Sequence, residues 1–209
     1  MVKYQGNIYI ISAPSGAGKS SLINALSKQK LPYETKKSIS HTTRNIRPGE
    51  MNGKDYHFIS KEEFQKMIDS HFFLEHAKVF NNYYGTAYST ITNITNYGIN
   101  AILAIDWQGM QQIKIKLPEA KSIFILPPSI EELARRLRNR GQDNEKTIYA
   151  RMKEAILEMS HYCEYDYLII NRDFSSALLE LKSIIHAEQL KMSLQRRNHC
   201  SLINKLLAI

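Results

Sequence analysis

Short apolar runs alternate along the chain with segments in which apolar residues recur every three or four positions. The runs cover residues 8–11, 99–105, 122–126 and 167–170, and all of them are rich in isoleucine. A helical pattern follows each run, as in folds where helices connect buried parallel strands. The pattern therefore predicts an α/β protein whose parallel sheet is flanked by helices.

The segment from residue 36 to residue 96 interrupts this alternation. It contains many tyrosine and hydroxyl side chains and several glycines. Ser60 and Glu63 have the spacing of a capping box, which predicts that a helix begins there, and residues 72–79 have the composition of a strand. We interpret the segment as an inserted substrate domain of mixed α+β structure.

The remaining residues, 1–35 and 97–209, are interpreted as the core domain. Ser129 opens a second capping box for a helix expected to stop at Gly141, and an amphipathic helix is expected from Thr147 onward. The polar loop between these helices favours a mobile arm. The C-terminal part of the chain is also helical in pattern, and its leucines could pack on the core or on another subunit, so a homo-oligomer is possible.

A phosphate-binding loop is predicted directly after the first apolar run. Residues 13–20 match the motif G-x-x-x-x-G-K-[ST] except at the first position, where Ala13 replaces glycine and is expected to have a negative φ. Backbone N–H groups from Ser15 onward would surround a polyphosphate, Lys19 would reach its outer phosphates, and the Ser20 hydroxyl would bind Mg²⁺. A glycine-rich turn with a solvated lysine is the alternative.

Composition and charge narrow the class of protein only partly. The chain has 209 residues, 43% of them hydrophobic, and no apolar run approaches the roughly 20 residues needed to cross a bilayer, so we expect a cytoplasmic protein without a membrane partner. Cys163 and Cys200 suggest neither a disulfide framework nor a zinc site, and are interpreted as buried or incidental thiols. The net charge of +8 fits phosphate-rich ligands but is equally compatible with nucleic acid.

A second candidate phosphate site lies in the interrupting segment. Arg44 and Arg47 stand three positions apart beside a Pro-Gly turn. Two guanidinium groups held together without neighbouring carboxylates can bind a phosphate bidentately. A solvated basic loop is the alternative, and the pair alone does not decide between them.

The ordered set of motifs resembles the guanylate kinase family over essentially the whole chain. After the phosphate loop, the matching segments are 38–58, 73–77, 82–86, 105–109, 135–141 and 165–171. The resemblance implies a P-loop NTPase-type core, an inserted GMP-binding domain and a helical lid at about residues 129–151. It also implies the reaction of ATP with GMP, and probably dGMP, to give ADP and GDP, with Mg²⁺ and without a nucleic-acid partner.

The resemblance further implies which residues form the site. The ATP-binding residues would be Ala13, Pro14, Ser15, Gly16, Ala17, Gly18, Lys19, Ser20, Ser21, Arg136 and Asn171. The GMP-binding residues would be Ser40, Arg44, Arg47, Tyr56, Glu75, Tyr84, Gly85, Thr86 and Asp106. The catalytic cations would be Lys19, Arg44, Arg140 and Arg151, while Mg²⁺ would lie at Ser20 and, through water, near Asp106.

The residues that the resemblance assigns to recognition of the guanine base, called the base reader below, also have the chemistry that guanine requires. Guanine presents two donors, N1–H and N2–H₂, beside the acceptor O6, so a carboxylate and a hydroxyl complement its edge, whereas adenine leaves a facing carboxylate unpaired. Glu75 would be that carboxylate. Its alternative role is a surface-facing residue of an otherwise apolar strand.

One departure from the family concerns the end of the second apolar run. Relatives commonly carry two alternate acidic residues where this chain has Ala104, Ile105 and Asp106. Residues 104 and 106 of a strand share a face, so the first carboxylate is missing. We expect this change to affect the surroundings of the metal and to leave the loop and the base reader intact.

Three other functions were weighed. A non-catalytic scaffold module would tend to lose Lys19 and the lid arginines, and this chain keeps them. A nucleic-acid-binding protein would be expected to show a recognisable module, and none is apparent. Glu75 argues against a kinase for a different nucleoside monophosphate.

Overall fold

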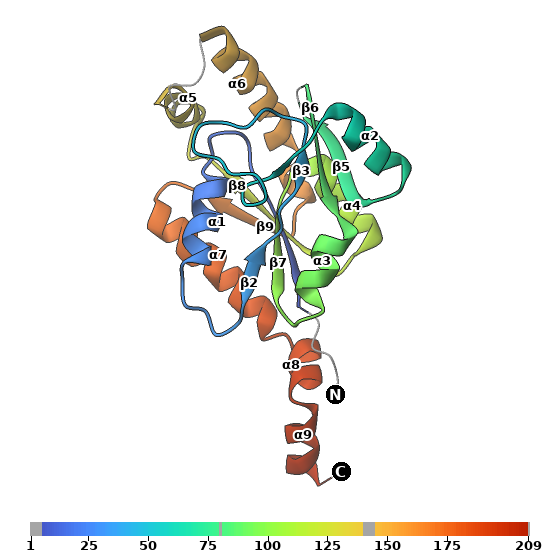
Figure 1. The fold of residues 1–209 in the computed structure, drawn as a ribbon. Helices are drawn as coiled ribbons and strands as arrows, with labels where there is room; N and C mark the ends of the chain where they lie inside the picture. The colour runs from blue at the N-terminus through green and yellow to red at the C-terminus, as the bar shows by residue number, and fades with distance from the viewer. Residues whose placement is uncertain (1–5, 80, 140–144, 209) are drawn as a thin grey trace.

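The chain folds around a parallel sheet whose strands alternate with helices (Figure 1). The computed structural model describes residues 6–79, 81–139 and 145–208. Within this part of the chain, five strands pair in parallel in the order β2-β7-β1-β8-β9. They are β1 (Ile8–Ser12), β2 (Thr35–Lys37), β7 (Asn100–Ala104), β8 (Lys121–Leu126) and β9 (Tyr167–Ile170). The four apolar runs are thus strands, and the predicted fold class is confirmed.

Helices cover both faces of this sheet because successive side chains of a strand point in opposite directions. Tyr9 and Ile11 of β1 pack against one pair of helices, while Ile10 between them packs against the other pair, and all three side chains are fully buried. The first pair is α1 (Lys19–Ser27) and α7 (Phe174–Gln189), and the second is α3 (Tyr88–Thr95) and α4 (Trp107–Lys116).

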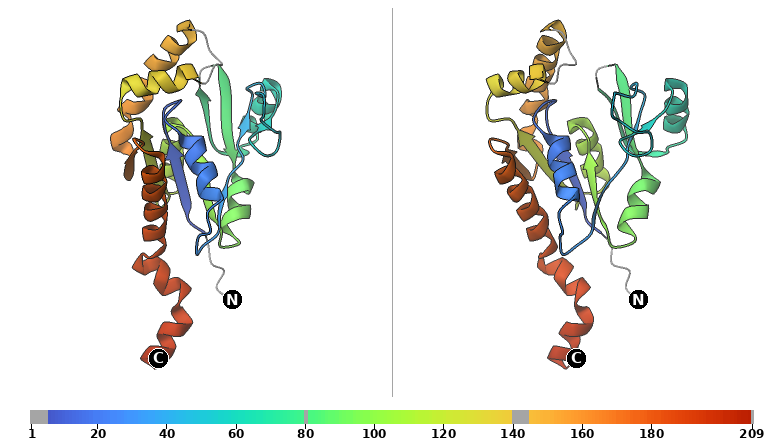
Figure 2. Two further views of the ribbon diagram at one scale, coloured as in Figure 1. Left: turned by 90° about the vertical axis from the view of Figure 1, so that its left-hand side faces the viewer. Right: turned by 60° about the vertical axis from the view of Figure 1, so that its left-hand side comes forward.

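A second, smaller sheet lies beside the first, in the order β4-β3-β6-β5 (Figure 2). Its elements are β3 (His41–Thr42), β4 (His57–Phe58), β5 (Phe73–Val79), β6 (Asn82–Ala87) and the helix α2 (Lys61–Asp69). Phe64 of α2 stacks on Phe73 with ring centroids 4.6 Å apart. The Ser60 hydroxyl accepts a hydrogen bond from the Glu63 N–H at 3.0 Å, as the capping box predicted. The division of the chain into domains at residues 36 and 97 stays a prediction.

Two helices of the expected lid follow β8. The Ser129 hydroxyl accepts a hydrogen bond from the Glu132 N–H at 3.1 Å, and α5 (Ile130–Asn139) begins there as predicted. The next helix, α6 (Glu145–Ser160), begins two residues earlier than expected and packs on α5. Arg140 and the predicted helix end at Gly141 lie outside the described residues.

The C-terminal region forms three helices, and the last two extend away from the sheet (Figures 1 and 2). These are α8 (Met192–Asn198) and α9 (Cys200–Leu207). Cys163, in the 3-10 turn η1 (Tyr162–Glu164), and Cys200 are both exposed, which leaves incidental thiols of the two alternatives and excludes buried ones. No helix in the described part of the chain has the length and apolar character to cross a membrane.

Candidate active site

The phosphate loop connects β1 to α1, and within it the Ala17 N–H donates to the Pro14 carbonyl at 3.1 Å. Gly16 and Gly18 have φ angles of 95° and 102°, a conformation that side chains other than hydrogen disfavour. Ala13 has no such positive φ, as expected. Gly18 caps α1 without a side-chain hydrogen bond, so the first turn of this helix offers donors to an anion. Residues 13–21 therefore have the geometry of an anion cradle.

Two residues that the resemblance assigns to ATP binding, Asn171 and Arg136, support this loop through hydrogen bonds. The Asn171 side chain donates to the Ala17 carbonyl at 2.7 Å, and Asn171 is itself buried. Arg136 donates to the Asn171 carbonyl at 3.1 Å and to Glu132 at 2.8 Å. A Cβ at Gly18 would lie 2.4 Å from the Asn171 amide nitrogen. The loop conformation is thus fixed by neighbouring side chains as well as by its glycines.

Lys19 lies at the carboxyl end of the sheet, where its Nζ donates to the Ile105 carbonyl at 3.1 Å. Burial lowers the pKa of the Lys19 ammonium, while the charges of Glu158 and Asp106 raise it. The lysine is therefore positioned among acidic side chains at the edge of the phosphate loop.

Glu158, on α6, belongs to this cluster although the sequence analysis did not select it. Its Oε2 is buried without a hydrogen-bond partner among the described residues. Burial raises the pKa of Glu158 to about 7, and the Lys19 charge opposes that shift. A signal was present in the sequence, since Glu158 follows Arg151 by two helical turns and therefore shares its face of α6.

Three predicted base-reading residues come together in the second sheet: Ser40 directly before β3, Glu75 on β5 and Thr86 on β6. The Ser40 and Thr86 hydroxyls are 3.0 Å apart, and both residues are buried. Glu75 pairs in register with Thr86, and only 2% of it is exposed. The alternative of a surface-facing Glu75 is therefore wrong.

A bulge in β5 explains why strand alternation does not predict this burial. Phe73 faces α2, and plain alternation would turn Glu75 to that same face. The pairing with β6 shifts between Phe73 and Glu75, and the extra residue, Leu74, packs into the core with Ile91. Such bulges re-aim the side chains that follow them, and this one directs Glu75 toward Thr86 and α4.

The Glu75 carboxyl is not fully satisfied by the protein. Its Oε1 is buried and has no hydrogen-bond partner in the described part of the chain. Burial raises the pKa of Glu75 to about 7, an effect that hydrogen bonding to Thr86 opposes and the Asp106 charge reinforces. A buried acceptor without a partner is costly, and a ligand that brings donors would remove that cost.

Arg44 has a carboxylate partner, contrary to the expectation for the arginine pair. Its Nη2 donates to both Glu50 oxygens at 2.8 and 2.9 Å, and the Arg47 N–H donates to the same carboxylate at 2.9 Å. The turn at Gly49, whose φ is 84°, brings Glu50 back toward the arginines. The sequence indicates the Pro-Gly turn, but its spacing alone does not show that the turn returns Glu50 to Arg44.

Aromatic residues complete the arginine site. The Arg44 guanidinium lies 5.6 Å from the centre of the Tyr56 ring, which is 5.9 Å from the Tyr84 ring. The structure thus gathers Arg44, Tyr56 and Tyr84, as predicted for a phosphate site. Gly85 has a different setting, because a Cβ there would meet the Phe73 ring at 2.9 Å on the opposite side of β6 from Thr86.

Asp106 caps α4 at the edge of the core sheet. Its Oδ1 accepts from the Gly109 N–H at 3.0 Å and its Oδ2 from the Gln108 side chain at 3.1 Å. Ala104, the position at which the resemblance leads to the expectation of an acid, pairs with Ile11 at the end of β7. Asp106 is therefore held firmly, and its charge acts on Lys19, Glu75 and Glu158.

The end of α6 is fastened to the start of α4. The Trp107 and His161 rings stack with centroids 3.7 Å apart and an interplanar angle of 8°. Glu164 is within 2.6 Å of the His161 ring nitrogen and accepts from Gln111 at 2.7 Å. This contact connects the helix that carries Arg151 to the residue that follows Asp106.

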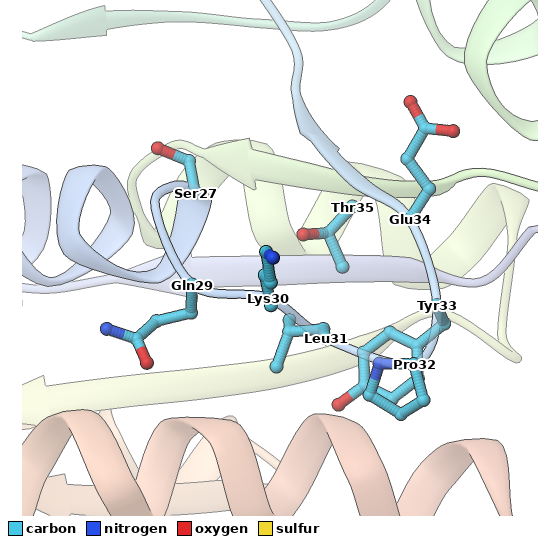
Figure 3. A pocket seen from close by; sticks show the side chains of 8 residues that line it. All are labelled: Ser27, Gln29, Lys30, Leu31, Pro32, Tyr33, Glu34 and Thr35. Carbon is cyan, nitrogen blue, oxygen red and sulfur yellow. The ribbon is translucent and has the colours of Figure 1, made fainter.

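A surface pocket of about 550 Å³ lies apart from these residues, between the end of α1 and β2 (Figure 3). It is lined by Ser27, Gln29, Lys30, Leu31, Pro32, Tyr33, Glu34 and Thr35. None of these is a predicted site residue, so the predicted chemistry belongs to the carboxyl end of the sheet and the second sheet.

The parallel sheet and the glycine loop between β1 and α1 define a P-loop protein of the α/β class. The model of the family described as guanylate kinase matches residues 5–188. Guanylate kinases of Escherichia coli and Salmonella typhimurium are 59% identical over 204 residues, which cover 98% of this chain and 99% of each relative.

A solved structure agrees with these matches. The crystal structure of guanylate kinase from Anaplasma phagocytophilum aligns with a TM-score of 0.76 at 36% identity, covering 92% of this chain and 90% of that one. The chain belongs to the guanylate kinase family. The predicted α/β P-loop fold and the assignment as an ATP:GMP phosphotransferase are thereby confirmed.

Proposed function

We propose that the chain transfers the γ-phosphoryl group of ATP to GMP, with Mg²⁺, and that dGMP serves as a second acceptor. ATP binds at residues 13–21, and GMP binds between the second sheet and Asp106. The protein acts in the cytoplasm, and assembly into a homo-oligomer remains a prediction that a mass measurement in solution can test.

The observation that carries the proposal is the buried carboxyl of Glu75, with its partnerless Oε1, beside the Ser40 and Thr86 hydroxyls. Guanine offers two adjacent donors to the carboxylate and an acceptor to a hydroxyl. Adenine would bring no donor to the carboxylate and leave it unpaired. A site of this kind can reject the wrong base by as much as about 10⁴-fold.

The arginine and tyrosine cluster supports binding of the GMP phosphate. Arg44, Arg47, Tyr56 and Tyr84 would donate to its oxygens. The contact of Arg44 with Glu50 at 2.8 Å fixes the guanidinium before GMP arrives, so less side-chain freedom is lost on binding.

The residues present fit a Mg²⁺ ion bound mainly through the nucleotide. In the described part of the chain, no three His, Cys, Asp or Glu side chains are grouped as a metal site. Ser20, exposed at the first turn of α1, would supply a hydroxyl, and Asp106 would act through water. Mg²⁺ commonly keeps several waters and phosphate oxygens as ligands, and when bound it neutralises phosphate charge.

Phosphoryl transfer in this site requires positioning and charge stabilisation. The attacking GMP phosphate oxygen is already anionic, so no general base is needed. Lys19, Arg44, Arg140 and Arg151 would stabilise the charge that spreads over the transferred group. Arg136 and Asn171 would hold the loop around ATP, and closure of the lid would exclude water and limit ATP hydrolysis.

The test is ADP formation from ATP and Mg²⁺ with GMP, dGMP, AMP, CMP or UMP as acceptor. We expect turnover with GMP and dGMP, and a kcat/KM for AMP lower by about 10³-fold or more. Comparable turnover with AMP would contradict the role of Glu75. No turnover with any acceptor would favour a binding module.

A further inference from the structure

Gly109, in the first turn of α4, lies directly against the Glu75 carboxylate. A Cβ built at Gly109 would be 2.6 Å from Glu75 Oε2 and 3.2 Å from Glu75 Cδ. Real Cβ atoms essentially never approach another heavy atom to 2.6 Å. The absence of a side chain at Gly109 therefore leaves the space that the carboxylate occupies.

The backbone of α4 gives no reason for glycine at this position. Gly109 is not among the described glycines with positive φ, and it lies inside a helix, where glycine costs about 0.5–1 kcal/mol relative to alanine. The local helix would favour alanine. The contact with Glu75 is what alanine would disturb.

The helix cannot simply move back to admit a side chain, because it is bound to β5 on both sides of Glu75. Gln112 accepts from the His76 N–H at 3.1 Å and donates to the His76 carbonyl at 2.8 Å. Lys116 donates to the Leu74 carbonyl. These contacts fix the spacing between α4 and β5, so a group added at Gly109 would displace the Glu75 side chain.

We propose that Gly109 is a specificity-determining positioning residue, which sets where the Glu75 carboxylate meets the N1–H and N2–H₂ donors of guanine. The inference rests on the proposed role of Glu75 as base reader. The bulge in β5 and the surface of Gly109 together restrict the Glu75 carboxylate to one position. Recognition of the 2-amino group then depends on a residue that does not touch the base.

The experiment compares GMP with IMP, which lacks the 2-amino group, in Gly109→Ala and the parent protein. We expect the KM for GMP to rise by about 10- to 100-fold. The preference for GMP over IMP should fall, while the KM for ATP stays unchanged and kcat changes less than the KM for GMP. Ile115→Ala, a substitution on the exposed surface of α4, is the matched control and should leave the preference for GMP as it is.

Second-site variants separate a clash with Glu75 from a general defect. In the Glu75→Ala background the contact at 2.6 Å is gone and the neighbour that remains is Ile105 Cδ1 at 3.2 Å, so Gly109→Ala should change the remaining activity and the melting temperature much less than in the parent protein. Glu75→Asp, shorter by one methylene, should restore part of the GMP preference to Gly109→Ala. Gly109→Ala effects of equal size with and without the Glu75 side chain would overturn the inference, including the case in which both proteins fail to fold.

The two proposals fail in different ways. If Glu75→Ala keeps the full preference for GMP over IMP, the base-reading role itself is wrong. If Glu75→Ala loses that preference and Gly109→Ala keeps it together with the parent KM, Glu75 remains the reader and the inference about Gly109 is wrong.

Discussion

The phosphate loop and the pocket around Glu75 are built by different means. The loop consists of consecutive residues whose backbone conformation depends on Gly16 and Gly18, and the Asn171 contact at 2.7 Å supports it. The pocket brings together side chains from distant parts of the chain: Ser40 just before β3, Glu75 on β5 and Thr86 on β6. One of those side chains, Glu75, keeps a buried acceptor without a partner.

The difference reflects what each region must distinguish. A phosphate chain is recognised by charge and by N–H donors, which a single loop supplies at little cost in stability. A base must be told apart from other bases, and that requires polar groups that are desolvated before the correct ligand arrives. Selectivity in the acceptor region thus comes with local instability, while the donor region stays compatible with a well-packed core.

Replacing Lys19 by alanine should produce the largest effect and should be confined to the donor region. We expect kcat to fall by about 10³-fold or more, since the transferred group loses a cation. GMP affinity, measured by calorimetry, should change less than about threefold, because Lys19 faces the loop and Ile105. A collapse of GMP affinity would show that donor and acceptor regions are not separable.

Acidification should act mainly on the acceptor region. The carboxyl of Glu75 has a pKa of about 7, and guanine donors bind its ionised form, so GMP affinity should fall by up to about tenfold per pH unit below pH 7. Acidification changes the stability of the fold in the opposite direction from the GMP affinity. The folded pKa is raised from 4.5 to about 7, so this contribution to stability is complete below pH 4.5 and is lost as the pH rises through 7.

Calorimetric titrations between pH 5.5 and pH 8 would measure the affinity. Glu75→Gln is the control, because the GMP phosphate titrates equally in both experiments. An identical pH dependence in Glu75→Gln would exclude Glu75 as the titrating group.

Arg44→Lys tests the phosphate site with a smaller expected effect. Lysine keeps the charge but has one nitrogen, whereas Arg44 donates from Nη2 to Glu50 at 2.8 Å and from Nη1 to the Asn45 carbonyl at 2.7 Å, so the KM for GMP should rise by about tenfold. The KM for ATP should stay the same. Arg135→Lys, on the exposed side of α5, is the matched control. An equal rise in the KM for GMP in that variant would show that Arg44 has no specific role.

Ala104→Asp should give the smallest change, at the boundary between the two regions. A carboxylate at the end of β7, two residues before the helix cap Asp106, should alter the Mg²⁺ concentration for half-maximal rate by about two- to fivefold. Ala104→Asn has the same shape without the charge and separates electrostatics from packing. An unchanged Mg²⁺ dependence in both variants would uncouple position 104 from the metal.

The two regions also differ in how far the sequence predicts them. The loop is encoded by adjacent residues, so spacing alone indicates its strand, its turn and the start of α1 at Lys19. The burial of Glu75 depends on a bulge, and strand alternation predicts the wrong face. The contact between Arg44 and Glu50 depends on a turn, and the approach of Glu158 to Lys19 depends on how α6 packs. Local patterns do not contain these long-range contacts.

The stack of Trp107 on His161 gives the chain an optical reporter of its own. The protein contains one tryptophan, so the fluorescence excited selectively in tryptophan, beyond the absorption of its 12 tyrosines, arises from a single position at the start of α4. His161 follows the last residue of α6 directly, and the two rings are 3.7 Å apart. Any movement of α6 that separates them changes the surroundings of that indole. The motion of the helix that carries Arg151 can therefore be followed in real time without a label.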